Sequence, residues 1–113
     1  MSVQKVIDCL NKQKGIKYVW GGETPQKGFD CSGLVKYCFK QGAGMNLPHF
    51  TGDLVKKGKP VKKNELKPGD LIFPSSHHVG VYIGNNNFIH APHTGDVVKV
   101  SQVGKFYAGR RLL

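Results

Sequence analysis

Apolar positions near the start of the chain recur with the period of an α-helix. They stand at i, i+3, i+4 and i+7, namely at Val3, Val6, Ile7 and Leu10. Such spacing forms one apolar stripe along a helix, and Gly15 is well placed to end it. The pattern therefore predicts an N-terminal amphipathic helix, and Cys9 is expected to pack near its apolar face.

A second helix is predicted to begin near Cys31 and to run to about Gln41. Asp30 suits the N-cap, because its carboxylate can accept hydrogen bonds from backbone N–H groups of the first turn. The glycines at 42 and 44 are typical of a helix end. Between the two predicted helices lies a Gly-rich connection that contains Tyr18.

The second half of the chain changes to short runs of Val, Ile, Phe and Tyr separated by Asn, Gly and Pro. Such runs are typical of strands, and Pro68-Gly69 is a turn signal before the first of them. The runs cover residues 71–73, 78–84, 87–92 and 96–100. Two helices followed by a meandering antiparallel sheet of four or five strands make an α+β protein.

Composition narrows the class of protein. With 113 residues, 39% of them apolar and 21% charged, the chain is expected to form one globular domain over residues 1–113. The formal net charge of +10 favours anionic surroundings such as nucleic acid, anionic lipid or a bacterial wall. The densest basic run, residues 56–67, lacks the aromatic residues that stack on bases, and its simplest interpretation is a solvated loop.

The N-terminal segment shows neither a signal peptide nor a stretch apolar enough to span a membrane. The sequence therefore does not indicate a route of export.

Three cysteines cannot all pair within one chain, so at least one thiol stays free. Cys31 falls in the first turn of the predicted helix, where unpaired backbone N–H groups and the helix dipole favour the thiolate. The same N–H groups can donate to an oxyanion, which suits a nucleophile. The alternative is that Cys31 is a small buried apolar residue, as we expect for Cys9 and Cys38.

A cysteine nucleophile needs a base, and His78 is the best placed of five histidines. In a strand it shares one face with Gly80, Tyr82 and Gly84. The other face is apolar, with Val79, Val81 and Ile83. We expect His78 to point away from the core, and the two glycines to leave open space above that face for a substrate backbone.

His90 follows His78 by twelve residues, so both imidazoles lie on one face of a hairpin with an odd loop. Direct opposition requires the hairpin to centre on Gly84. The asparagines at 85–87 favour a later centre, which slides the two histidines apart by about two to four residues unless a bulge intervenes.

A zinc site is a further alternative, built from Cys31 with His77, His90 and His93. No ligand spacing of the usual kind supports it. His49 follows Leu47-Pro48 in a predicted loop, where a surface position is favoured over one lining a cleft.

Several motifs, in order and in spacing, resemble the NlpC/P60 family of papain-like cysteine peptidases that act on peptidoglycan. They are "YVWGG" (18–22), "FDCSGLVKY" (29–37), "LP" (47–48), "LKPGDLIF" (66–73), "HVGVYIG" (78–84) and "FIHAP" (88–92). The resemblance implies a papain-like core in which Cys31 is the nucleophile, His78 the general base and His90 the residue that orients His78.

By the same resemblance, Tyr18 helps the backbone of Cys31 to hold the oxyanion, and Asp30 and Ser32 contact the free amine of the stem peptide or nearby polar atoms. The family commonly cleaves the bond between D-isoglutamate, or its amide, and the following diamino acid, without a metal or organic cofactor. The resemblance implies a monomeric enzyme with a single catalytic domain over residues 1–113 and no separate wall-binding domain. It is expected to act outside the cell or on the wall, to bind no nucleic acid and not to insert into a membrane. Two alternatives stay open: a thiol acyltransferase or amidase on the same scaffold, and a non-catalytic basic wall-binding module.

Overall fold

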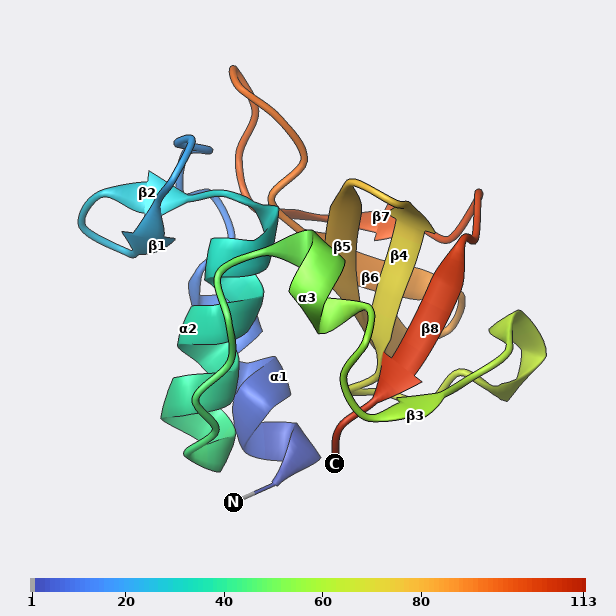
Figure 1. Ribbon diagram of the computed structural model, residues 1–113. Coiled ribbons are helices and arrows are strands. Elements are labelled where there is room, and N and C mark those ends of the chain that lie inside the picture. The colour runs from blue at the N-terminus through green and yellow to red at the C-terminus, as the bar shows by residue number, and fades with distance from the viewer. Residues whose placement is uncertain (1) are drawn as a thin grey trace.

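A computed structural model describes residues 2–113, in which helices pack on one face of a six-stranded antiparallel sheet (Figure 1). The predicted α+β class is confirmed. In chain order the elements are α1 (Val3–Lys12), β1 (Glu23–Thr24), β2 (Gly28–Phe29), α2 (Cys31–Ala43), α3 (Thr51–Leu54), β3 (Lys59–Pro60), the 3₁₀ turn η1 (Lys63–Glu65), β4 (Leu71–Ser75), β5 (His78–Gly84), β6 (Asn87–His90), β7 (Lys99–Gln102) and β8 (Ala108–Arg111).

Both predicted helices form where local capping signals place them. Ser2 caps α1 by accepting a hydrogen bond from the Lys5 backbone, and Asp30 caps α2 as predicted. Helix α2 ends slightly later than expected, at a left-handed Gly44 with φ of 67°. The two helices lie side by side, so their facing apolar side chains are buried together.

The sheet has the strand order β3-β8-β4-β5-β6-β7. Strands β4 to β7 form the predicted meander, with each strand antiparallel to the next. Sequence patterns missed β8, which pairs with the free edge of β4, and β3, which pairs with β8. Both are short and largely polar, and neither alternates clearly between apolar and polar residues.

The strand predicted over 96–100 was misplaced, because β7 covers Lys99–Gln102. Residues 97 and 98 pair instead with the connection after α1: Val98 exchanges backbone hydrogen bonds with Gly15 and Ile16, and Val97 bridges Lys17. This pairing ties the Gly-rich connection to the sheet side of the molecule.

The main core lies between α1, α2 and one face of the sheet. The face of β5 predicted to be apolar supplies Val79 and Val81, both fully buried in this core. A smaller cluster on the opposite face contains Ile72, Phe88 and Val103. None of the helices formed by residues 2–113 is long and apolar enough to cross a membrane.

Helix α2 runs the length of the helical layer, so its start and its end lie at opposite ends of that layer. In Figure 1 the chain enters α1 and leaves β8 near the end of α2, away from the start of that helix. Thirteen residues of α-helix span about 20 Å. Both ends of the chain therefore lie remote from Cys31.

Candidate active site

Cys31 is the first residue of α2, and its thiol is half-exposed. Two segments distant in sequence reach its sulfur. Thr51 Oγ1, from the first residue of α3, lies 3.5 Å from Sγ, and the carbonyl oxygen of His77 lies 4.0 Å from Sγ. The thiol is therefore accessible from solvent, and the start of β5 lies beside it.

The capping carboxylate of Asp30 joins the helix start to the Gly-rich connection. Its Oδ1 accepts a hydrogen bond from the Gly33 backbone at 2.8 Å, and its Oδ2 accepts one from the Gly21 backbone at 3.0 Å. A side chain at Gly33 would collide with the carbonyl oxygen of Gly22. The glycine thus permits the close approach that fixes the connection beside Cys31.

Tyr18 lies on this connection and faces the same centre. Burial raises the pKa of Tyr18, and the nearby negative charges of Cys31 and Asp30 raise it further. The phenol therefore keeps its proton and is available as a hydrogen-bond donor. Ser32, in contrast, is buried, and its hydroxyl donates to Asp30 Oδ1 at 3.5 Å.

A chain of polar side chains runs across the sheet from His78. Nε2 of His78 lies 2.7 Å from Nδ1 of His90, and Nε2 of His90 lies 2.8 Å from the hydroxyl of Ser101 on β7. Sequence reasoning paired the two histidines but missed Ser101, because no local signal marks a serine that meets a histidine of the neighbouring strand.

The hairpin register lies within the predicted range. Val81 is opposite Ile89, so His90 stands two positions from direct opposition to His78. Asn85 and Asn86 form the turn with φ of 53° and 62°, and a bulge follows Tyr82. The imidazoles therefore meet along a diagonal, which their ring size can bridge.

The expectation of open space above Gly80 was wrong. A Cβ at this position would lie 2.7 Å from the ring of Phe88, 2.8 Å from the Ile89 carbonyl oxygen and 3.0 Å from the Cβ of His90. Phe88 and His90 stack here, with ring centroids 4.3 Å apart. Gly80 is thus the gap into which the neighbouring strand's side chains pack, and it brings His90 to His78.

The environments of His78 and His90 favour uncharged imidazoles at neutral pH. Burial lowers the pKa of His78, and the positive charge of His93 lowers it further. Burial also lowers the pKa of His90 from 6.5 to about 4, and the charges of His78 and Lys99 act in the same direction. A neutral imidazole is the form that can accept a proton.

His49 is only partly exposed and lines the region of the site, whereas the favoured expectation was a surface position. Its ring is largely covered, with Nδ1 at 2.6 Å from Glu23 Oε2 and Nε2 at 2.7 Å from Asp30 Oδ1. The loop that follows α2 folds back over the start of that helix. Glu23, Thr51 and Ser101 are the polar residues of this region that the sequence did not indicate.

Of the remaining histidines, His77 approaches the thiol through its backbone carbonyl oxygen. His77 and His93 are exposed, and His93 contacts Asp96. Among residues 2–113, no group of three or more His, Cys, Asp or Glu side chains is arranged to hold a metal ion. The zinc alternative gains no support from the geometry.

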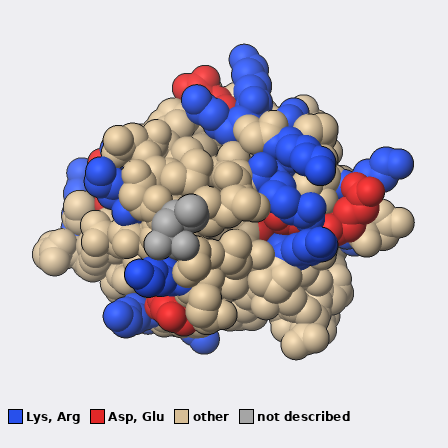
Figure 2. Space-filling view, turned by 90° about the horizontal axis from the view of Figure 1, so that it is seen from below, with Lys and Arg blue, Asp and Glu red and all other residues tan. Residues whose placement is uncertain are grey.

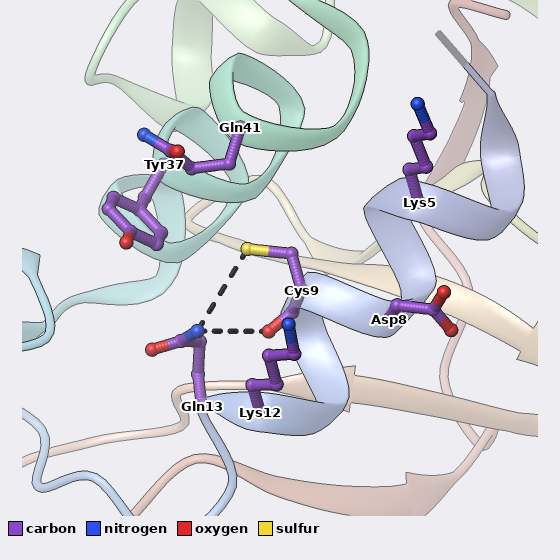
Figure 3. Close-up of a pocket in the computed structure, with 7 residues that line it drawn as sticks. All are labelled: Lys5, Asp8, Cys9, Lys12, Gln13, Tyr37 and Gln41. Carbon is purple, nitrogen blue, oxygen red and sulfur yellow. Dashed lines mark hydrogen bonds between the residues drawn. The ribbon is translucent and has the colours of Figure 1, made fainter.

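A separate pocket lies between α1 and α2 (Figure 3). Cys9 and Tyr37 line it from facing helices. Tyr37 stands six residues beyond Cys31, about 9 Å along the helix, so this pocket is distinct from the site around Cys31. Cys38 is fully buried nearby. A hydrogen bond with Cys9 raises the pKa of the Cys38 thiol, and burial raises it further.

Comparison with known proteins gives consistent matches. The NlpC/P60 family profile matches residues 15–113. Murein DD-endopeptidase MepH of Escherichia coli (strain K12) is 38% identical over 109 residues, which cover 89% of this chain and 40% of that protein. Murein DD-endopeptidase MepS/Murein LD-carboxypeptidase of the same strain is 37% identical over 111 residues, which cover 95% of this chain and 58% of that protein.

Solved structures agree with the fold. An NlpC/P60 family protein from Bacillus cereus superposes with a TM-score of 0.93 at 30% identity, covering 100% of this chain and 41% of that chain. The NlpC/p60 domain of the peptidoglycan hydrolase SagA superposes with a TM-score of 0.92 at 30% identity, covering 99% of this chain and 100% of that chain. The chain spans about half the length of the curated relatives it matches, between 40% and 58%.

Proposed function

Because the chain belongs to the NlpC/P60 family, we propose that it is a cysteine endopeptidase that hydrolyses the stem peptides of peptidoglycan. The observation that carries this proposal is the half-exposed thiol at the start of α2, which lies beside the start of β5. The first residue of β5, His78, is hydrogen-bonded to His90, which is hydrogen-bonded in turn to Ser101. A nucleophile, a neutral base and a partner that orients the base are what acyl transfer through a thiol requires.

The proposed mechanism uses one set of tautomers. The Nε2 proton of His78 is donated to Nδ1 of His90, and the Nε2 proton of His90 is donated to Ser101. This assignment leaves Nδ1 of His78 with a lone pair that accepts the thiol proton. The sulfur of Cys31 then attacks the peptide carbonyl, and His78 returns the proton to the departing amine. Water, activated by His78, hydrolyses the thioester and frees the thiol.

The oxyanion formed on attack needs donors. At the start of α2, the backbone N–H of Cys31 has no intrahelical acceptor, and the phenol of Tyr18 retains its proton. We assign the oxyanion to these two groups. Contacts from Asp30 and Ser32 to the substrate amine remain part of the proposal, although both side chains already hydrogen-bond within the protein.

For the bond cleaved, we propose the link between D-isoglutamate, or its amide, and the following diamino acid. A second candidate is a bond between two D-configured centres, because MepH and MepS are both named DD-endopeptidases. Defined substrates distinguish the two bonds.

The test is mass spectrometry of two substrates after incubation with the protein. One is a stem peptide with the D-isoglutamyl bond and no bond between D-centres, and the other is a cross-linked dimer that contains both. We expect the single stem to release a product that begins with the diamino acid. Cleavage of the dimer alone, at the bond between D-centres, would select the second candidate.

The same experiment separates hydrolysis from acyl transfer. In the presence of an added amine, a thiol acyltransferase would yield the amine adduct in place of the free acid. Failure to cut either substrate, with a Cys31 that resists alkylation, would instead favour the non-catalytic wall-binding module.

We also propose that a basic face holds the protein near anionic wall polymers. Residues 56–67 carry six Lys and one Glu, and the pairing of β3 with β8 adds Arg110, while the neighbouring Arg111 is ion-paired with Asp70. Figure 2 views the molecule from the end where β8 leaves the sheet, and Lys and Arg clearly outnumber Asp and Glu there. Polyanions with phosphate or carboxylate groups complement such a surface.

Neutralising Lys59 and Lys62 together to glutamine should weaken binding to insoluble walls several-fold, and salt should weaken the wild type steeply, because exposed charges are screened. Co-sedimentation with purified walls at rising ionic strength measures both effects. Glutamine at Lys14 and Lys27 removes the same charge elsewhere and serves as the matched control. Equal losses for the two pairs would show that net charge, and not this face, governs binding.

A further inference from the structure

His49 forms a bridge between two carboxylates at the start of α2. Its Nδ1 lies 2.6 Å from Glu23 Oε2, and its Nε2 lies 2.7 Å from Asp30 Oδ1. The other oxygen of Glu23 accepts a hydrogen bond from Lys36 at 2.7 Å. A β-hairpin, a helix start and a returning loop therefore meet at one imidazole.

The partners of His49 determine where its protons lie. Asp30 accepts hydrogen bonds from two backbone N–H groups, so its carboxylate acts as an acceptor. The hydrogen bond from Lys36 is the largest of the influences that lower the pKa of Glu23, which keeps that carboxylate ionised. An ionised carboxylate can only accept, so both ring nitrogens of His49 must donate. An imidazole that donates from both ring nitrogens carries a positive charge.

This cation stands beside a charge that would otherwise oppose catalysis. Asp30 is next to Cys31 in the chain and is largely buried, and a carboxylate near a thiol disfavours the thiolate. A hydrogen-bonded cation on Asp30 offsets that effect and leaves the cap intact. Neutralising Asp30 by substitution instead would lose the cap and the hydrogen bond to Gly21.

We propose that His49 is a positioning residue that acts through Asp30: as a cation clamped by Glu23, it holds the capping carboxylate in place and offsets its charge beside the nucleophile. The inference rests on the proposed function only in taking Cys31 as that nucleophile. The inference adds a loop residue to the site, separate from the hydrogen-bonded series His78, His90 and Ser101.

Other groups around the thiol do not supply this charge. Tyr18 keeps its proton, Thr51 is neutral, and His77 contributes a backbone carbonyl. Lys36 is bound to Glu23, and His78 is the proposed base. The cation hydrogen-bonded directly to Asp30 is His49.

The test compares His49→Gln, which keeps a hydrogen-bond donor but removes the charge, with His49→Arg, which restores a cation. The readout is the rate of alkylation of Cys31 by iodoacetamide as a function of pH, followed by peptide mapping. In His49→Gln we expect the midpoint of the profile to rise by about half to one unit, and alkylation below it to slow about three- to tenfold. In His49→Arg we expect a profile near that of the wild type.

Cys9 provides a control within the same molecule, because its half-exposed thiol lies between α1 and α2. Its profile should not change in either variant. A merely structural role would lower the unfolding temperature of both variants and leave the Cys31 midpoint unmoved. An unmoved midpoint in His49→Gln, or an equal rise in both variants, overturns the proposal.

A second measurement needs no variant. Long-range ¹⁵N NMR of the wild type should show protons on both ring nitrogens of His49 at neutral pH, and a neutral ring would contradict the inference even if the variants fail to fold. Alkylation and NMR require no substrate. Failure of the peptidase proposal would therefore appear as absent cleavage, whereas the NMR signals of His49 would be unaffected by it.

Discussion

Replacement of Cys31 by alanine should reduce peptide cleavage about a thousandfold or more. No other described side chain can take its place as nucleophile, because Cys9 lies in a separate pocket and Cys38 is fully buried. Loss of a covalent nucleophile typically removes most of an enzyme's rate enhancement. Release of product from a defined muropeptide, measured by chromatography, checks the result.

The fold should survive this change. Asp30 caps α2 through its side chain and does not depend on the thiol, so the circular dichroism spectrum and unfolding temperature of Cys31→Ala should match those of the wild type. Cys9→Ser is the matched control, because it removes a half-exposed thiol far from the site and should keep full activity. Cleavage by the alanine variant at the wild-type rate would reject Cys31 as the nucleophile.

Removal of the base should have the second largest effect. His78→Gln is expected to lower kcat about a hundred- to ten thousandfold, because glutamine cannot take the thiol proton. His90→Gln should cost less, about tenfold, since His90 orients His78 and does not itself exchange a proton with the substrate. Initial rates at saturating substrate measure both losses, and equal losses would contradict the separate roles.

The pH profile offers a second check on the same pair. Burial and the charge of His93 lower the pKa of His78, so its neutral form persists as the pH falls below the ordinary value of 6.5. The acid limb of kcat/KM should therefore lie below that pH. An acid limb at or above 6.5 would mean that the charged imidazole is stabilised in the free enzyme.

Features with local causes were predicted well. Asp30 caps α2 and Gly44 ends it, because capping depends on residues within one turn of the terminus. The buried face of β5 also followed from its alternation. The register of the hairpin could be bounded but not chosen, since the bulge after Tyr82 depends on packing against neighbouring strands.

Features with long-range causes were missed. Strand β8 forms because the edge of β4 is open to it, which its own residues do not indicate. Gly80 was correctly noticed but wrongly interpreted, because a glycine in a strand marks either open space or the close approach of another group. His49 meets Asp30 across nineteen positions of sequence, and only the returning loop brings them together.

The placement of the chain ends has a practical consequence. The start of α1 and the end of β8 lie on the side of the molecule where α2 ends, away from the start of that helix. A fluorescent label, an affinity tag or a bead linker joined at either end would thus leave the thiol facing free solution. Immobilised protein is accordingly a suitable format for capturing the covalent acyl intermediate that we propose from a mixture of wall fragments.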